Sequence, residues 1–191
     1  MGLKTLLDEL DSVSTRKKKE MISDCLVSGF SEDEYQVVVL DRGFNGKMPF
    51  VINNEIINVV KGVCGDAESA YEKATRIHGW IMSNIDYGDK KRKHGYRNSI
   101  ETFYDHEGVC GEMSMLYISM ARSVGIRASY ALVDIDDKNK KVDHACSMLD
   151  VTGRHGKRML VDSAYRRFDV NHISYRPIND FEMFQRLNSF Q

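Results

Sequence analysis

Apolar side chains recur every three or four residues in two long segments of the chain, the spacing of one buried helix face. The first stripe predicts a helix from Asp66 to Ile85. The second, traced from Glu112, predicts a helix that begins near Gly111 and stops at Gly125, since glycine is a common residue just past a helix end. The two stripes consist of Ala70, Ala74, Ile77, Ile81 and Ile85, and of Met113, Leu116, Tyr117, Met120, Ala121 and Val124.

A polar and basic run at residues 88–98 separates these two helices and leads into a short predicted helix at residues 99–106. Such a run is by default a solvated loop. If it borders the functional site, it could also attract an acidic substrate. Its basic members are Lys90–Lys93, His94 and Arg97.

The period of the pattern changes after Gly125, where residues 127–136 alternate in polarity and are rich in strand-forming side chains. Residues 142–151 and 157–165 have the same character, with turn-forming residues between them, so three antiparallel strands are expected. The chain closes with a short helix that Asn179 can cap. Helices followed by an antiparallel sheet predict an α+β fold, with a helical first half packed on the sheet.

The first residues read as a separate part of the chain. Residues 1–45 predict a helical segment, in which Ser31 and Glu34 have the spacing of a capping box. The turn-forming run RGFNGKMP, residues 42–49, then marks a boundary. Residues 46–191 are long enough to form one domain with a core of its own.

Composition and charge exclude several classes of protein. The formal net charge of −1 argues against a nucleic-acid partner that is bound through a basic surface. The four cysteines form no Cys-x-x-Cys pair, so no structural zinc is expected, and no other cofactor is indicated. No apolar run is long enough for a signal peptide or a membrane span. We therefore expect a cytoplasmic protein without a membrane partner; the oligomeric state is not indicated.

The motif Gly-Val-Cys-Gly occurs twice, around Cys64 and around Cys110, each time followed by an acidic residue and a helical pattern. A cysteine in the first turn of a helix faces unpaired backbone N–H groups and the positive end of the helix dipole, which favour the reactive thiolate. The same N–H groups can hold the oxyanion of a tetrahedral intermediate. A carboxylate beside the sulfur would oppose this, so the helix is expected to point Glu112 elsewhere.

A cysteine nucleophile needs a base and a group that orients the base. His144 and Asp162 stand eighteen residues apart, with Gly153 midway between them. If the second and third strands form a hairpin about Gly153, the two side chains face each other. A slip of one residue would separate them. The helix after Cys110 leads directly into these strands, which favours Cys110 over Cys64 as the nucleophile.

The other cysteines and histidines have less specific interpretations. Cys64 and Cys25 are expected to pack in the core, and Cys146 to line the pocket beside His144. His106, four residues before Cys110, is an alternative base. Three side chains are open candidates for a second oxyanion donor: Trp80, Tyr96 and Asn98. The remaining histidines are expected at the surface or in loops: His78, His94, His155 and His172.

Five pieces of sequence, in order, resemble the transglutaminase-like superfamily of papain-type cysteine enzymes. They are a helix ending in IDYG, the EGVCGEMSMLY segment, the strand entry VGIRASYALV, the DHACSML strand and the RMLVDSAY strand. The resemblance covers residues 56–165 and implies Cys110 as nucleophile, His144 as general base and acid, and Asp162 as the orienting carboxylate. Two residues depart from the family pattern. Cys146 stands where tryptophan is usual, and Ser163 replaces a proline, which is expected to loosen the turn after Asp162.

The resemblance also implies an activity. We expect a hydrolase that cleaves a peptide or isopeptide bond of a peptide or protein substrate through an acyl-thioester on Cys110. Two alternatives stay open: transfer of the acyl group to an amine, and a non-catalytic binding or scaffold protein on the same fold.

Overall fold

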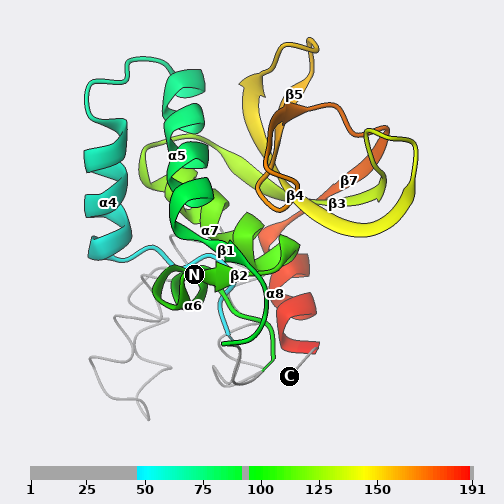
Figure 1. The fold of residues 1–191 in the computed structure, drawn as a ribbon, viewed down its shortest axis with the longest axis horizontal. Helices are drawn as coiled ribbons and strands as arrows, with labels where there is room; N and C mark the ends of the chain where they lie inside the picture. The colour runs from blue at the N-terminus through cyan, green and yellow to red at the C-terminus, as the bar shows by residue number, and fades with distance from the viewer. Residues whose placement is uncertain (1–46, 92–94, 190–191) are drawn as a thin grey trace, which may run out of the picture.

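One helix, α7 (Cys110–Ser123), lies at the centre of the fold. In the computed structural model, which describes residues 47–91 and 95–189, helices cover one side of α7 and an antiparallel sheet covers another (Figure 1). Every residue of α7 from Gly111 to Ala121 is buried. The apolar stripe predicted after Glu112 is therefore one face of a helix that is enclosed on all sides.

Three helices form the layer against α7, and each begins after a side chain that accepts a hydrogen bond from the first turn. They are α4 (Asn54–Cys64), α5 (Ala70–Asn84) and α6 (Ser99–Asp105), capped by Asn53, Ser69 and Asn98. None of the helices in the described part of the chain has the length and apolar character needed to cross a bilayer.

The predicted face of α5 is buried at Ala74, Ile77 and Ile81, as expected. The predicted start of this helix at Asp66 is wrong, because α4 ends at Cys64 and the chain turns before α5 begins. The pattern at residues 54–64 did not reveal α4.

The sheet has five antiparallel strands in the order β6-β5-β4-β3-β7. The strands are β3 (Ala128–Ile135), β4 (Lys141–Thr152), β5 (Arg158–Asp162), β6 (Arg167–Val170) and β7 (Ser174–Ile178). The first three are the predicted ones, and the final helix is α8 (Asp180–Ser189), where the Asn179 side chain accepts a 2.7 Å hydrogen bond from Glu182 N. The α+β class is confirmed. The strands β6 and β7 were not predicted. β6 is too short to show a clear alternation of polarity, and β7 carries Pro177, which is tolerated because β7 is an edge strand.

Two short strands set the start of α7 beside the end of α5. β1 (Asp86–Tyr87) pairs in parallel with β2 (Glu107–Gly108), with Tyr87 opposite Gly108. Two longer-range hydrogen bonds then fix α7 between its neighbours. Tyr117 donates to the Ala74 carbonyl of α5 (2.9 Å), and Ser147 of β4 donates to the Ser114 carbonyl (3.2 Å).

The segment predicted for residues 1–45, with its capping box and Cys25, lies outside the described residues. The division into residues 1–45 and 46–191 therefore stays a prediction.

Candidate active site

The first turn of α7 is held from behind by a buried ion-pair cluster. Glu112 is fully buried, accepts a 3.0 Å hydrogen bond from Val109 N and pairs with Arg97 Nη1 at 3.0 Å. Arg97 also pairs with Asp105 at 2.7 Å and Glu107 at 2.9 Å. The Glu112 carboxylate is thus engaged by Arg97 and the Val109 backbone, as the sequence argument requires.

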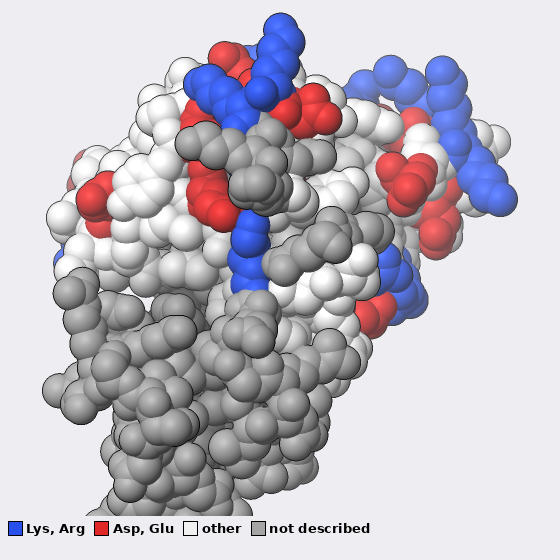
Figure 2. Space-filling model, turned by 90° about the horizontal axis from the view of Figure 1, so that it is seen from below, with Lys and Arg blue, Asp and Glu red and all other residues white. Residues whose placement is uncertain are grey.

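Lys90 and Lys91 are exposed, as expected for a solvated loop, but Arg97 departs from that expectation. Arg97 is only 2% exposed, and its guanidinium is neutralised inside the protein. Lys91 bonds through its backbone to Glu107 (2.9 Å) and through Nζ to the Asp105 carbonyl (2.8 Å). Basic and acidic side chains also lie next to one another on the face shown in Figure 2. Residues 92–94, with His94, lie outside the described part.

His144 of β4 and Asp162 at the end of β5 are in direct contact, with His144 Nε2 2.8 Å from Asp162 Oδ2. The predicted register is nevertheless wrong. Ser147 pairs with Val161, so the strands are displaced by two residues from a pairing of His144 with Asp162, and the register shifts again between Leu149 and Thr152. A displacement of two keeps both side chains on one face of the sheet, where they meet as diagonal neighbours.

Tyr165 supports this pair from the turn after β5. Its ring stacks on the His144 ring at 4.1 Å between centroids, and its backbone N–H donates to Asp162 Oδ1 at 2.9 Å. The turn predicted to be loosened by Ser163 is therefore closed by a hydrogen bond of its own.

The two groups shift each other's titration. Burial alone would lower the pKa of His144, but hydrogen bonds with Asp162 and Cys110 raise it to about 9. Burial would raise the pKa of Asp162, but hydrogen bonds from His144 and His172 lower it to about 2. Near neutral pH, an imidazolium and a carboxylate are thus both favoured beside the Cys110 sulfur.

His172 is a site residue that sequence reasoning missed. It was expected at the surface, but it is 1% exposed, and its Nε2 lies 3.0 Å from Asp162 Oδ2. It follows the short strand β6 in a loop, and loop residues are usually solvent-exposed, so no pattern marked it. Two imidazoles therefore share one carboxylate oxygen.

The group His144, Asp162 and His172 is also the one metal-capable cluster among the described residues. Two nitrogens and an oxygen would suit a first-row transition metal. However, His172 Nδ1 is buried without a hydrogen-bond partner in the described part of the chain. A metal-ligating histidine normally donates its other N–H to an acceptor, so hydrogen bonding fits this cluster better than metal binding.

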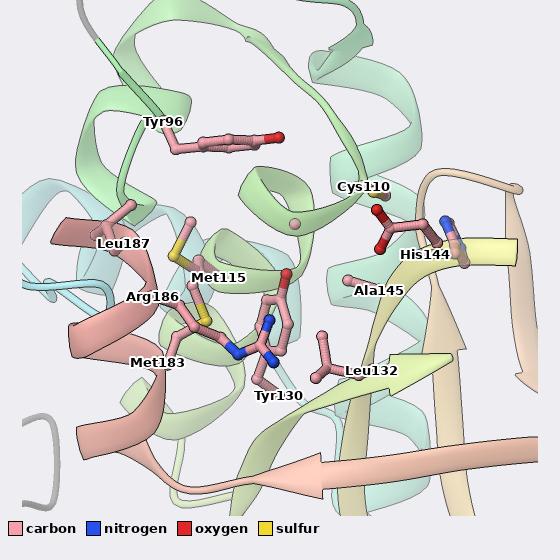
Figure 3. A pocket seen from close by; sticks show the side chains of 12 residues that line it. Tyr96, Cys110, Met115, Tyr130, Leu132, His144, Ala145, Met183, Arg186 and Leu187 are labelled. Carbon is pink, nitrogen blue, oxygen red and sulfur yellow. The ribbon is translucent and has the colours of Figure 1, made fainter. Parts of the chain in front are cut away.

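A pocket of about 140 Å³ opens beside Cys110 and His144 (Figure 3). Most of its wall is apolar or aromatic, and besides His144 its charged lining residues are Asp143 and Arg186. The apolar and aromatic lining residues are Tyr96, Met115, Tyr130, Leu132, Ala145, Met183 and Leu187. Burial strongly raises the pKa of Tyr130, so its hydroxyl stays protonated beside Gly111.

Of the proposed oxyanion donors, only Tyr96 lines this pocket. Asn98 caps α6, and Trp80 stacks on Phe103 at 5.7 Å. Tyr87, which the sequence analysis did not name, lies closer to the helix start. The pKa of Tyr87 is raised overall, by burial and by the charges of Cys110, Tyr165 and Asp162. A hydrogen bond with the Cys110 backbone opposes this shift.

The alternative residues lie elsewhere. Cys64 is the buried last residue of α4, and burial raises its pKa. Cys146 is fully buried in a cluster with Ala131 and Val133 and does not line the pocket, which corrects that expectation. His106, the alternative base, is an exposed left-handed residue at the end of α6, and its Nδ1 contacts the Asn84 carbonyl at 3.1 Å.

Comparison with known proteins gives one family match. The family model described as "Transglutaminase-like superfamily" matches residues 57–166, more than half of the chain. A comparison with curated proteins gives no significant match.

Several solved structures are similar to this chain. A candidate cysteine protease from Cytophaga hutchinsonii aligns with a TM-score of 0.50 and 21% identity over 64% of this chain and 42% of that chain. A candidate protease from Parabacteroides distasonis aligns with a TM-score of 0.45 and 13% identity, over 70% of this chain and 27% of that chain. Calcium-bound LapG from Legionella pneumophila aligns with a TM-score of 0.46 and 10% identity, over 83% of this chain and 82% of that chain. The chain thus spans less than half the length of the first two.

Proposed function

The chain belongs to the transglutaminase-like superfamily, and on that premise we propose that it is a cysteine hydrolase of amide bonds. Its substrate is a peptide or protein, and the cleaved bond is a peptide or isopeptide bond. Cys110 is the nucleophile, His144 the general base and acid, and Asp162 the orienting carboxylate. The observation that carries this proposal is the His144 ring, bonded to buried Asp162 at 2.8 Å and interacting with Cys110 at the start of α7.

The first half of the reaction forms the acyl-enzyme. Because Nε2 of His144 is bonded to Asp162, Nδ1 is the ring nitrogen left to take the Cys110 proton. The thiolate attacks the amide carbonyl, and the oxyanion is held by backbone N–H groups in the first turn of α7. The C–N bond then breaks as His144 returns its proton to the leaving amine, and a thioester remains on Cys110.

The second half releases the product. His144 takes a proton from water, the resulting oxygen nucleophile adds to the thioester, and the C–S bond breaks. A carboxylic acid leaves, and the sulfur regains its proton from His144. A primary amine in place of water would give acyl transfer by the same steps.

Asp162 and His172 act by positioning. Asp162 accepts from His144, His172 and Tyr165 N, so its carboxylate has little freedom to turn. A fixed carboxylate holds the His144 ring in the orientation and tautomer that the proton transfers need.

The test offers a mixture of casein peptides to the wild-type chain and to Cys110→Ala, with and without a labelled primary amine. New peptide termini that form only with wild-type enzyme support the hydrolase. Incorporation of the amine would instead assign acyl transfer. Neither product, with Cys110 no more reactive than an ordinary thiol, would overturn the enzyme proposal in favour of a scaffold.

A further inference from the structure

Arg186 of α8 lines the same pocket as Cys110 and His144. In Figure 3 its side chain extends from α8 toward Tyr130, while Cys110 and His144 lie on the opposite side of the pocket. No step of the proposed reaction uses this guanidinium, so its position calls for another role.

The guanidinium has spare hydrogen-bonding capacity. Its one side-chain partner in the described part of the chain is Glu182, reached from Nε at 3.5 Å. The same carboxylate already receives two closer bonds from Arg176, at 2.9 and 3.0 Å. The two terminal amino groups of Arg186 therefore have no hydrogen-bond partner among the described residues, and the side chain is 40% exposed.

The pocket wall suits an anion on an apolar stem. Met115, Met183 and Leu187 lie with Arg186 around the cavity, together with the rings of Tyr96 and Tyr130. An apolar wall lowers the local dielectric and so strengthens a charge pair at its end. The planar fork of an arginine matches a carboxylate through two parallel hydrogen bonds.

Asp143 gives the pocket a direction. The His144 imidazolium at this end is already paired with the buried Asp162 carboxylate at 2.8 Å. Asp143 is exposed and directly precedes His144. Its negative charge disfavours an anion at that end, so an anionic group is expected at the α8 end, some bonds away from the reacting carbonyl.

We infer that Arg186 forms a carboxylate-binding subsite, so that the preferred substrates carry a carboxylate several bonds from the cleaved amide. This inference rests on the proposed function and specifies its substrate class. The carboxylate can belong to a glutamate-like side chain or to the free C-terminus of a short peptide, and both present the same chemistry to the guanidinium.

The first test needs no known substrate. N-iodoacetyl-4-aminobutyrate and its neutral amide are matched alkylating agents that differ only in a carboxylate. The ratio of their alkylation rates at Cys110, mapped by mass spectrometry, is measured in the wild-type chain and in Arg186→Gln. We expect the ratio to fall roughly tenfold in Arg186→Gln, as for the loss of a hydrogen bond to a charged group.

Two further variants sharpen the test. Arg127→Gln removes an 87% exposed guanidinium outside the pocket and should leave the ratio unchanged. Glu182→Gln removes the competing carboxylate and should raise the ratio. Added salt should reduce the wild-type preference, since the pair is partly exposed.

The outcomes separate this inference from the proposed function. An equal ratio in wild type and Arg186→Gln, with the neutral agent still selective for Cys110, overturns the subsite alone. Loss of selectivity for Cys110 with the neutral agent counts against the proposed function. An unchanged neutral rate in Arg186→Gln shows that this variant is folded. Peptides that pair an internal glutamate with an amidated C-terminus, or a glutamine with a free C-terminus, then identify the source of the carboxylate.

Discussion

The two Gly-Val-Cys-Gly motifs have the same four residues, but one ends a helix and the other begins a different helix. Gly62 to Gly65 close α4, and Gly108 to Gly111 open α7. Cys64 is 4% exposed with a raised pKa, and its sulfur lies 4.0 Å from the Lys73 carbonyl. Cys110 is only partly buried and lines a pocket. Equal composition thus gives one thiol that is buried at a helix end near a backbone carbonyl, and another that lines a pocket at a helix start.

The acidic residue after each motif explains part of this difference. Glu112 accepts the Val109 N–H and reaches buried Arg97, which fixes a helix start. Asp66 is 93% exposed and pairs with Arg76 at the surface. Gly65 has a φ of +46° and donates its N–H to the Lys61 carbonyl, a backbone geometry that ends a helix.

The largest contrast is expected from exchanging each cysteine for alanine. Cys110→Ala should lower the rate of amide cleavage about ten-thousandfold or more, because the proposed nucleophile is lost. Cys64→Ala should leave the rate within about twofold and lower only the free energy of unfolding, by about 1 kcal/mol. Rates on the peptide mixture and urea denaturation measure both. Equal loss of activity in the two variants would contradict the assignment.

The acidic residues should differ strongly in their effect on stability. Glu112→Gln leaves Arg97 buried with one charge partner fewer, which we expect to lower the free energy of unfolding by about 3–5 kcal/mol. Asp66→Asn, the matched change after the other motif, should have no measurable effect. Urea denaturation checks both, and a tolerated Glu112→Gln would show that the cluster does not hold the helix start.

His172→Phe fills the same space without donating to Asp162. We expect Cys110 alkylation at pH 6 to slow by about tenfold, the lower end of effects seen for supporting hydrogen bonds. His172→Gln retains an N–H donor and should recover part of the rate. Cys64 in the same samples is the internal control. An unchanged rate and pH profile in His172→Phe would reduce His172 to a packing residue.

The glycines should respond in opposite directions. A Cβ at Gly111 would lie 2.5 Å from the Tyr130 hydroxyl, so Gly111→Ala should destabilise the chain by about 1–3 kcal/mol. Adding Tyr130→Phe should restore part of this loss. A Cβ at Gly62 meets nothing within 4 Å, so Gly62→Ala should stabilise α4 by about 0.5–1 kcal/mol. Thermal unfolding measures each change, and equal effects at both glycines would contradict the packing described.

The pair of His144 and Asp162 should give the active-site side a pH dependence of stability that Cys64 does not share. His144, whose pKa is raised to about 9, contributes stability that is fully present below pH 6.5 and is lost as pH rises through about 9. Asp162, whose pKa is lowered to about 2, contributes stability that is present above about pH 4 and is lost as pH falls toward 2. The gap in unfolding free energy between wild type and Asp162→Asn should therefore be widest from about pH 4 to 6.5. The difference between wild type and Cys64→Ala should not change with pH over that range. A pH-independent difference for both variants would contradict the ion pair of His144 with Asp162.

Some of the fold was readable from the sequence because single elements carried strong periods. The α5 and α7 stripes, the Asn179 cap and strands β3 to β5 were all predicted. The pairing of His144 with Asp162 was reached through a wrong register, and the contact exists because a shift of two preserves the strand face. Cys64 was misplaced at a helix start, since the local motif is the same as that of Cys110. Arg97 and His172 could not be placed, because each is buried by partners distant in sequence that no local pattern encodes.

The most direct test of the account is the alkylation of the native chain by substoichiometric iodoacetamide at pH 6 to 7, with the labelled cysteine mapped. We predict that Cys110 is labelled well before Cys64 and Cys146, and that His144→Ala slows it about tenfold or more. Slow, equal labelling of all three, or an undiminished Cys110 rate in His144→Ala, would contradict the claim that His144 activates a thiolate at the start of α7.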